Sequence, residues 1–443
     1  MAVKSKERSQ KKPSSVNFIV KSLSGIPDGV EHEVWFHGLL PREDITLLLK
    51  EKGQFLVRQT EPMQGQGLKA VLSVFWLGKA RHFIINKTSD GKVCIGKERF
   101  DNVDDLVRFH QTRKVPLTEG SGALLVTPVP KQDWELHHDQ IQLGSLLGEG
   151  AFGGVYEGYM TLANGDRIKV AAKVHKGKEM SKTAIKEICK EARIMRRYEH
   201  KNIVKFHGVA IAMEPIMLIM ELVDGGALDK YLEKKGAEIS AIKKLNMCCD
   251  ASCGLEYLHK NECIHRDLAA RNCLLSNEIV KISDFGLSRE MADREARYKI
   301  KDLKQRLPIR WLAPETLKDG SYSTKTDVYS FGVLMWEIFK NGAIPYAEMT
   351  VQEVNVYVKK GNRLPAPDMM PMVARDVMLK KCFSENPDKR VTMTEIRRSL
   401  EKTCRRSSSA NKSKYDKSSK DFGLSKESKS VWENKMTPDI STN

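Results

Sequence analysis

Three side chains in the second half of the chain have the types and spacing that phosphoryl transfer requires. Asp267 and Asn272 lie within the segment His265–Asn272, and Asp284 follows twelve residues after Asn272. A transferred phosphoryl group needs a carboxylate near the attacking hydroxyl and oxygen ligands for a divalent cation. Asp267 is therefore the candidate base, and Asn272 and Asp284 are the candidate Mg²⁺ ligands.

Local patterns around these residues predict the elements that hold them. The apolar pair in Val280–Ile282 predicts a short strand before Asp284, and Gly286 gives the backbone freedom to turn after it. Helical patterns cover Val328–Lys340 and Ala374–Phe383. The order of strand-like segments before long helical ones indicates a mixed domain of α and β structure.

A glycine-rich segment precedes these residues and predicts a nucleotide site. Strand-like sequence flanks it on both sides, which favours a hairpin that offers backbone N–H groups to phosphates over the strand-to-helix turn of dinucleotide folds. Lys173 ends a later apolar run and is placed to pair with α and β phosphates. The predicted nucleotide-binding residues of the hairpin are Leu147, Gly148, Glu149, Gly150, Ala151, Phe152, Gly153, Gly154 and Val155.

A buried lysine needs a carboxylate, and Glu191 is the candidate partner of Lys173. Ile188, Glu191 and Met195 fall at helical spacing and share one face. A surface glutamate is the alternative interpretation, and it would be preferred if Glu191 stood alone.

The whole set resembles the eukaryotic protein kinases. The glycine-rich loop, Lys173, Glu191, the segment from His265 to Asn272, Asp284-Phe285-Gly286 and Ala313-Pro314-Glu315 occur in that family's order. The resemblance implies a two-lobed fold with ATP in the cleft, adenine contacts from the backbone of Glu221 and Val223, and Met220 as gatekeeper. Arg271 in Asp267-Leu268-Ala269-Ala270-Arg271-Asn272, together with Pro308-Ile309-Arg310-Trp311, is typical of tyrosine rather than serine/threonine specificity.

A second group of residues nearer the amino terminus indicates an anion-binding domain. The segment Gly53–Thr60 predicts a strand in which Arg58 and Thr60 share one face. An arginine among apolar neighbours is costly to bury alone, but its planar fork can bind a phosphate through two charge-assisted hydrogen bonds. Arg42, which follows Pro41 at the start of a helical pattern, is a second cation.

These residues resemble an SH2 domain, with Trp35-Phe36-His37-Gly38 at its start and His82-Phe83 in its central strands. The predicted phosphotyrosine-binding residues are Arg42, Arg58, Thr60 and His82. Val71–Trp76, Arg81–Ile85 and Trp134–His138 resemble the Fes/Fer group of non-receptor tyrosine kinases. About 30 residues precede this domain, too few for the F-BAR region of that group.

The expected class is α+β: an SH2 domain, with a central antiparallel sheet flanked by two helices, followed by a two-lobed kinase fold. Residues 1–30 are expected to be a flexible basic leader, 35–129 the SH2 domain, 130–140 a linker, 141–403 the kinase domain and 404–443 a disordered Ser/Lys-rich tail. The tail contains Lys420–Ser425, a near copy of Ser283–Ser288, and a triplet match without a catalytic loop carries no function.

Composition restricts the remaining possibilities. The 443 residues are 41% hydrophobic and carry a net charge of +17, which indicates acidic partners. Nine scattered cysteines favour a reducing compartment over a disulfide framework, and a zinc site at Cys248, Cys249 and Cys253 is a minor alternative because no matching ligand set is apparent. No apolar run is long enough to span a membrane.

We therefore expect a cytoplasmic enzyme that uses ATP and Mg²⁺. The expected partners are phosphotyrosine-containing proteins and tyrosine substrates, with peripheral contact to an anionic membrane left open and no specific nucleic acid. A phosphotyrosine-binding scaffold with an inactive kinase fold and a nucleic-acid binder are the competing classes.

Regulation is expected at two places. Tyr298 is the candidate autophosphorylation site, with Arg266 and Arg289 as candidate partners of its phosphate. The short linker favours activation by SH2 packing on the small lobe over inhibition by phosphorylated Tyr415 in the tail.

Overall fold

The computed structural model describes residues 21–22, 30–62, 67–150, 153–175, 182–290, 298–299 and 307–404. These residues form two compact units: the first contains residues up to Asp224 together with Ser283–Arg289, and the second contains Gly225–Ile282 and the chain from Glu290 on. Within the described ranges no helix has both the length and the apolar character needed to cross a bilayer. All nine cysteines are described, and no disulfide joins any of them.

The first unit begins with a small sheet domain. Strands β3 and β4 continue antiparallel from β2, and β8 adds parallel to the other edge of β2. A second, three-stranded sheet follows, and two helices accompany the sheets. The elements are η1 (Val30–His32), α1 (Arg42–Leu48), β2 (Gln54–Thr60), β3 (Lys69–Trp76), β4 (Lys79–Ile84), β5 (Asn86–Lys87), β6 (Val93–Ile95), β7 (Glu98–Phe100), α2 (Val103–Arg113) and β8 (Thr127–Pro128).

Strand β2 is the centre of this domain. Its five middle residues, Phe55 to Gln59, are all buried, because both faces of the strand are covered. The core below it joins Trp35, Phe55 and Leu72 with residues of α2, and it also takes in Ala212 from a later part of the chain. The predicted strand Gly53–Thr60 and the helix that begins at Arg42 are confirmed.

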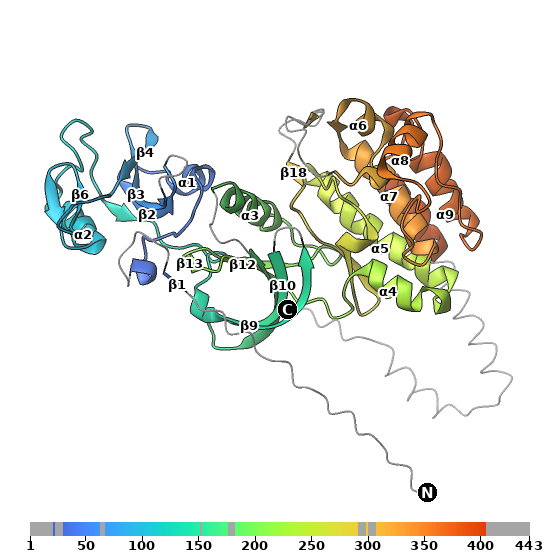
Figure 1. Ribbon diagram of the computed structural model, residues 1–443, viewed down its shortest axis with the longest axis horizontal. Helices are drawn as coiled ribbons and strands as arrows, with labels where there is room; N and C mark the ends of the chain where they lie inside the picture. The colour runs from blue at the N-terminus through green and yellow to red at the C-terminus, as the bar shows by residue number, and fades with distance from the viewer. Residues whose placement is uncertain are drawn as a thin grey trace, which may run out of the picture. The chain divides into compact units, whose positions relative to one another are not determined.

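The same unit then forms a five-stranded antiparallel sheet in the order β12-β14-β11-β10-β9, with α3 packed beside it (Figure 1). Buried side chains alternate along β10, as expected for a sheet with one face on a core. The elements are η2 (His138–Gln140), β9 (Ile141–Gly150), β10 (Gly153–Thr161), β11 (Arg167–His175), α3 (Lys182–Met195), β12 (Phe206–Ala210), β13 (Met213–Glu214) and β14 (Met217–Glu221).

One strand of this unit lies inside the segment expected to be a leader. Strand β1 (Lys21–Ser22) pairs antiparallel with β13, and Val30 is buried in the core of the first domain. The other residues of the leader, and those of the tail beyond residue 404, lie outside the described ranges.

The second unit is mainly helical. Its helices are α4 (Leu228–Lys235), η3 (Gly236–Glu238), α5 (Ala241–Lys260), η4 (Ala270–Asn272), η5 (Ile309–Trp311), α6 (Pro314–Asp319), α7 (Thr324–Phe339), α8 (Val351–Lys359), α9 (Met372–Asp376), η6 (Val377–Cys382) and η7 (Pro387–Lys389), and residues 393–404 are also helical. Its short strands include β15 (Cys263–Ile264), β16 (Cys273–Ser276), β17 (Ile279–Ile282), β19 (Tyr298–Lys299) and β20 (Ser321–Tyr322); β18 (Arg289–Glu290) spans the boundary of the units.

Helix α7 is the central support of this unit. It begins at the N-cap Ser323, and every residue from Thr326 to Phe339 is buried. A helix that is buried on every side lies inside a domain. The helix was predicted from Val328, four residues after it begins, and the predicted helix from Ala374 falls across α9 and the π-helical turn η6.

Candidate active site and phosphotyrosine pocket

The described residues of the glycine-rich segment lie at the end of β9 and the start of β10. Glu149 faces Gly154 and Gly148 faces Val155 in the antiparallel register, while Ala151 and Phe152 lie outside the described residues. Gly153 has a φ of +147°, and a Cβ there would lie 2.0 Å from the carbonyl oxygen of Val174. Only glycine fits this approach. The antiparallel pairing of β9 with β10 agrees with the hairpin expected from the flanking strands.

Lys173, Glu191 and Asp284 come together in the first unit. The Nζ atom of Lys173 lies 2.8 and 2.9 Å from the two carboxylate oxygens of Glu191 and 3.6 Å from Oδ1 of Asp284. Burial alone would lower the pKa of Lys173, but the two carboxylates outweigh it and raise that pKa. The lysine therefore carries a full positive charge beside two carboxylates. Glu191 is only 6% exposed and is not the surface glutamate of the alternative interpretation.

Asp284 occupies a backbone conformation that most residues avoid. Its φ is +58°, and its Oδ1 accepts a hydrogen bond of 3.3 Å from the N–H of Gly286. The next residue, Phe285, is fully buried with its ring centroid 6.3 Å from that of Tyr198. The buried phenylalanine fixes this turn, and the turn sets the position of the carboxylate.

The second unit holds the loop with Asp267 and Asn272. The amide nitrogen of Asn272 donates to the carbonyl oxygen of Asp267 over 2.8 Å, and Asp267 forms an ion pair with Arg271. The guanidinium of Arg271 lies 4.2 Å from the centre of the Trp311 ring. The two residues predicted to act on the hydroxyl group and the cation are therefore joined directly, and an aromatic ring supports the arginine.

Two acids of α7 anchor this loop, and the sequence analysis did not single them out. Asp327 accepts hydrogen bonds from the N–H groups of His265 (2.7 Å) and Arg266 (2.9 Å). Glu337 accepts from the N–H of Ala270 (2.9 Å) and from Nε1 of Trp311 (3.0 Å). An acid inside an otherwise apolar helix was the available signal, since a buried carboxylate must find donors.

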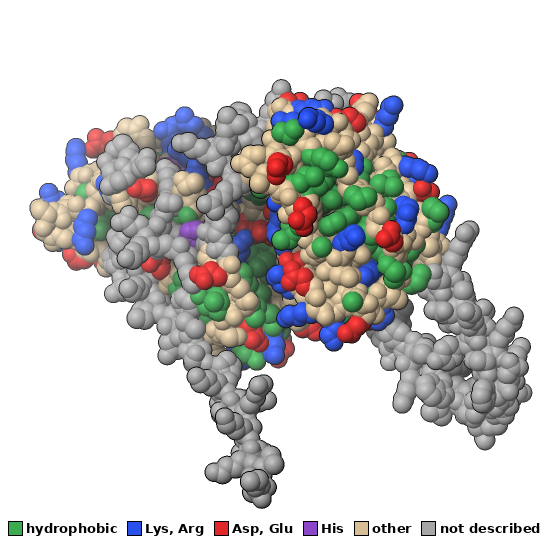
Figure 2. All heavy atoms as spheres, turned by 45° about the vertical axis from the view of Figure 1, so that its right-hand side comes forward, with side chains coloured by type: hydrophobic (Ala, Val, Ile, Leu, Met, Phe, Trp, Pro, Cys, Tyr) green, Lys and Arg blue, Asp and Glu red, His purple; other side chains and the backbone are tan. Residues whose placement is uncertain are grey.

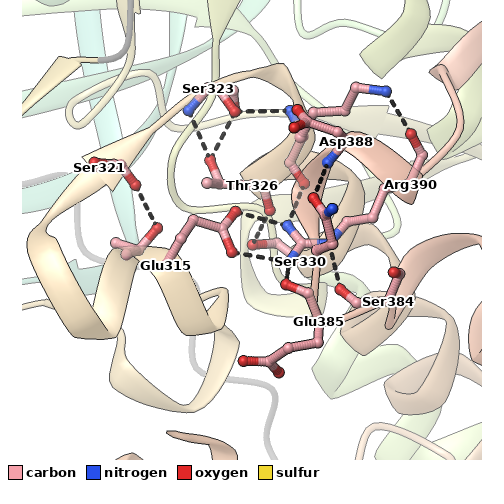
Figure 3. Close-up of polar contacts among 12 residues, drawn as sticks. Glu315, Ser321, Ser323, Thr326, Ser330, Ser384, Glu385, Asp388 and Arg390 are labelled. Atoms are coloured by element: carbon pink, nitrogen blue, oxygen red, sulfur yellow. Dashed lines mark hydrogen bonds and ion pairs between the residues drawn. The ribbon is translucent and has the colours of Figure 1, made fainter. Parts of the chain in front are cut away.

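Glu315, recognised only as part of a motif, has a distant partner. Its carboxylate receives two hydrogen bonds from the guanidinium of Arg390, of 2.7 and 2.8 Å, and Arg390 is 1% exposed (Figure 3). Arg390 also donates to the carbonyl oxygens of Ser384 and Lys325. This paired arginine ties α6 to the segment that precedes the last described helix.

The predicted phosphotyrosine residues line one cavity of about 390 Å³. Arg42, Arg58, Thr60 and His82 all border it. Burial, with a smaller contribution from Arg42, lowers the pKa of Arg58 to about 10, and the same causes together with Arg58 lower the pKa of His82 to about 4. His82 is therefore neutral at pH 7 and shares a 2.9 Å hydrogen bond with Ser73, while the two arginines supply the charge.

An ion pair between a buried aspartate and a partly buried arginine links α1 of the first domain to α3. Asp44 accepts hydrogen bonds from Nε and Nη2 of Arg193, of 2.9 and 2.6 Å, and lies 3.6 Å from Arg196. The hydrogen bond to Asp44 is the main reason that the pKa of Arg193 is raised. Glu191 lies on the same helix as Arg193, so this pair reaches the helix that holds Lys173.

A second junction joins the first domain to the linker and to the five-stranded sheet. Nδ1 of His37 lies 2.9 Å from the carboxylate of Glu135, and Nε2 lies 3.0 Å from the carbonyl oxygen of Val129. The N–H of Leu39 donates to the carbonyl oxygen of Ile211 over 3.0 Å. Gly38, with a φ of +57°, permits this approach, because a Cβ there would lie 2.2 Å from that oxygen.

The structure describes only the backbone at Tyr298. Tyr298 pairs with Tyr322 in the two-stranded sheet of β19 and β20. The guanidinium of Arg266 lies 4.0 Å from the centre of the Tyr322 ring. Autophosphorylation of Tyr298 and the pairing of its phosphate with Arg266 and Arg289 stay predictions.

In the structure, a glutamate lies beside two of the cysteines considered for a zinc site. The donor atoms of Cys249, Cys253 and Glu401 lie within 4.8 Å of one another, whereas Cys248 is fully buried. Three donors are one fewer than a structural zinc site uses. Zinc binding at this place stays the minor alternative.

Two family models match the chain and agree with these two regions. Residues 35–110 match the SH2 domain, and residues 141–400 match the family described as protein tyrosine and serine/threonine kinase. The site geometry and these matches define the class of the protein: a protein kinase with an SH2 domain.

Comparison with individual proteins narrows the class. The chain is 40% identical over 368 residues to the tyrosine-protein kinase Fer of Homo sapiens, an alignment that covers 83% of the chain and 43% of Fer. It is 39% identical over 382 residues to Fer-related kinase 1 of Caenorhabditis elegans, which covers 85% of the chain and 95% of that protein. The transforming protein Fps of avian sarcoma virus (strain PRCII) is 37% identical over 372 residues, or 83% of the chain and 67% of Fps. The chain belongs to the Fer/Fps group of protein tyrosine kinases.

Proposed function

We propose that this protein transfers the γ-phosphoryl group of ATP to tyrosine side chains of other proteins. The observation that carries the proposal is the ion pair of Lys173 with the buried Glu191, with the more exposed Asp284 3.6 Å from the same ammonium. A lysine that binds the α and β phosphates must be held by a carboxylate in an active kinase. A scaffold with an inactive kinase fold has no need of this arrangement, which ranks that class second.

Each catalytic residue has a role that its chemistry supports. Asp267 accepts the proton of the attacking hydroxyl, and Arg271 and Asn272 hold Asp267 in place by the contacts described above. Since phosphoryl transfer depends mainly on positioning and charge, the acids of α7 contribute indirectly by fixing the loop.

The nucleotide and the metal have suitable residues. The hairpin Leu147–Val155 offers backbone N–H groups to phosphates, and Glu221 and Val223 offer backbone groups to adenine. The N–H of Glu221 donates to the carbonyl oxygen of Lys205, so an adenine contact from Glu221 would use its carbonyl oxygen. Asn272 and Asp284 supply the hard oxygen donors that Mg²⁺ prefers, and the bound cation would neutralise charge on the phosphates.

Preference for tyrosine is supported by Arg271 and Trp311. The guanidinium of Arg271, which pairs with Asp267, lies over the indole ring of Trp311. Trp311 ends η5, and Pro308 is the N-cap of that turn. A phenol is longer than a hydroxymethyl group, and an aromatic platform with a nearby cation suits its ring.

We propose that the SH2 domain recruits the kinase to phosphotyrosine and supports its active form. Asp44 and Arg193 provide the physical link, because they connect α1 to the helix that carries Glu191. The competing hypothesis, inhibition by phosphorylated Tyr415, concerns a residue outside the described ranges.

We further propose that the protein acts in the cytoplasm, with diffuse contact to anionic membrane surfaces. The net charge of +17 supports attraction to such surfaces. On the face shown in Figure 2, basic and acidic side chains are interspersed rather than gathered by sign, which favours weak, unspecific contact.

The test of the catalytic proposal is phosphorylation of mixed Ser, Thr and Tyr peptides by the purified chain with ATP and Mg²⁺. We expect label on tyrosine only, and a loss of kcat of about 10²–10⁴ in Asp267→Asn, the range for a general base. ATP affinity should be unchanged in that variant. No label on tyrosine with wild-type protein, or equal turnover by Asp267→Asn, would contradict the proposal.

A further inference from the structure

The kinase domain contributes one wall of the phosphotyrosine pocket. The cavity bordered by Arg42 and Arg58 is also lined by Ile185 and Lys186, from the first turns of α3. Ile185 is 7% exposed, whereas the side chain of Lys186 is 50% exposed. A ligand in this cavity therefore meets side chains of two domains.

The pocket is prepared for an anion at its SH2 side. Arg58 is 5% exposed, and its Nη1 donates to the carbonyl oxygen of Leu40 over 3.2 Å. Its buried Nε has no hydrogen-bond partner among the residues that the structure describes. A buried cation with an unused donor is costly, and a phosphate that enters beside it would remove part of that cost.

Lys186 now has a weak partner that a phosphate would outcompete. Its Nζ lies 3.4 Å from the carboxylate of Glu43, and both side chains are about half exposed. Glu43 borders the same cavity and is close enough to Arg58 to act on its pKa. The phosphate of phosphotyrosine carries almost two negative charges. It therefore attracts the flexible ammonium of Lys186 more strongly than one exposed carboxylate does.

We propose that Lys186 is a phosphate-binding residue, so that a phosphotyrosine ligand bridges the SH2 domain and α3. This inference rests on the proposed function of the SH2 pocket and extends it. Lys186 lies five residues before Glu191 on the same helix. Binding of the ligand is thereby coupled to the helix that positions Lys173, and the coupling works in both directions.

The test measures binding of a fluorescent phosphotyrosine peptide to the full chain. Lys186→Ala should bind about five- to tenfold more weakly, the effect of losing one partly exposed charge-assisted contact. The matched control is Lys169→Ala, a surface lysine paired with Glu157 in β10 and remote in sequence from the pocket, which should bind like wild type. Arg58→Lys should lose most of the affinity.

A double variant separates contact with the phosphate from neutralisation of Glu43. If Lys186 touches the phosphate, Lys186→Ala should weaken binding in the Glu43→Gln background as well. No effect in that background, or wild-type affinity of Lys186→Ala itself, overturns the inference while Arg58 keeps its role. Failure of the wild-type chain to prefer the phosphorylated peptide would instead refute the proposed SH2 function. Equal thermal midpoints of the variants show that all are folded.

Discussion

Single residues of this protein show how a distant contact decides a local role. Asp267 and Asn272 were found from their spacing, but their positions depend on Asp327 and Glu337, which come from a helix more than fifty residues later. The sequence shows what a side chain can do, and burial among fixed donors decides how well it is placed.

Glu337 should make the stability of the protein depend on pH. Burial raises its pKa from the ordinary value of 4.5 to about 7, against the effect of its donors Trp311 and Ala270. The folded protein then holds this proton more tightly than the unfolded chain. The free energy of unfolding should therefore fall as the pH rises from about 4.5 to 7, by about 3 kcal/mol from this group.

Glu337→Gln lacks this contribution. The thermal midpoint of the variant should therefore rise relative to the midpoint of wild type as the pH increases from 5 to 8. Thermal unfolding across this range measures the effect, with the exposed Glu348→Gln as control. Parallel curves for wild type and Glu337→Gln would show that the acid does not titrate there.

The strands and helices could be predicted from the sequence, but the contacts between them could not. The strand with Arg58 and the helix with Glu191 follow from period and polarity. The extension of α7 to Thr324 was missed because its first turn is polar and its N-cap Ser323 gives only a local signal. The paired Asp44 and Arg193 lie 149 residues apart, and no spacing rule connects positions so distant.

The ion pair between α1 and α3 should support catalysis. Asp44→Asn should lower kcat about five- to tenfold, the effect of about 1–1.4 kcal/mol lost from the active arrangement of α3. Phosphorylation of a fixed tyrosine peptide measures it, and Asp104→Asn, which alters an exposed pair with Arg108, is the control. The swap Asp44→Arg with Arg193→Asp should restore part of the rate; full activity of Asp44→Asn would show that the pair is not coupled to catalysis.

At the scale of the whole molecule, the two domains of the first unit share buried contacts. The sequence predicted a short linker but not that its Glu135 binds His37, because each residue was recognised only as part of a separate motif. Independent domains should unfold independently, and domains joined by buried polar contacts should unfold together.

We therefore expect His37→Ala to destabilise this junction by about 2–3 kcal/mol, since the buried carboxylate of Glu135 loses its imidazole partner and keeps the hydrogen bond from the N–H of Gln132. Hydrogen exchange should speed up at the N–H of Leu39, which bonds to Ile211. His32→Ala, whose side chain is 68% exposed, serves as control. Unchanged exchange at Leu39 in His37→Ala would mean that the domains hold together without this contact.

The place of Ala212 in the core of the SH2 domain matters for engineering. In a chimera, a foreign phosphotyrosine-binding domain would replace residues 35–129. The core of that domain would not be shaped to pack against Ala212. It would also need glycine at the site of Gly38 to let the chain pass Ile211. Domain shuffling at the linker should thus give insoluble or uncoupled hybrids, and a successful graft would have to bring the matching loop of the small lobe with it.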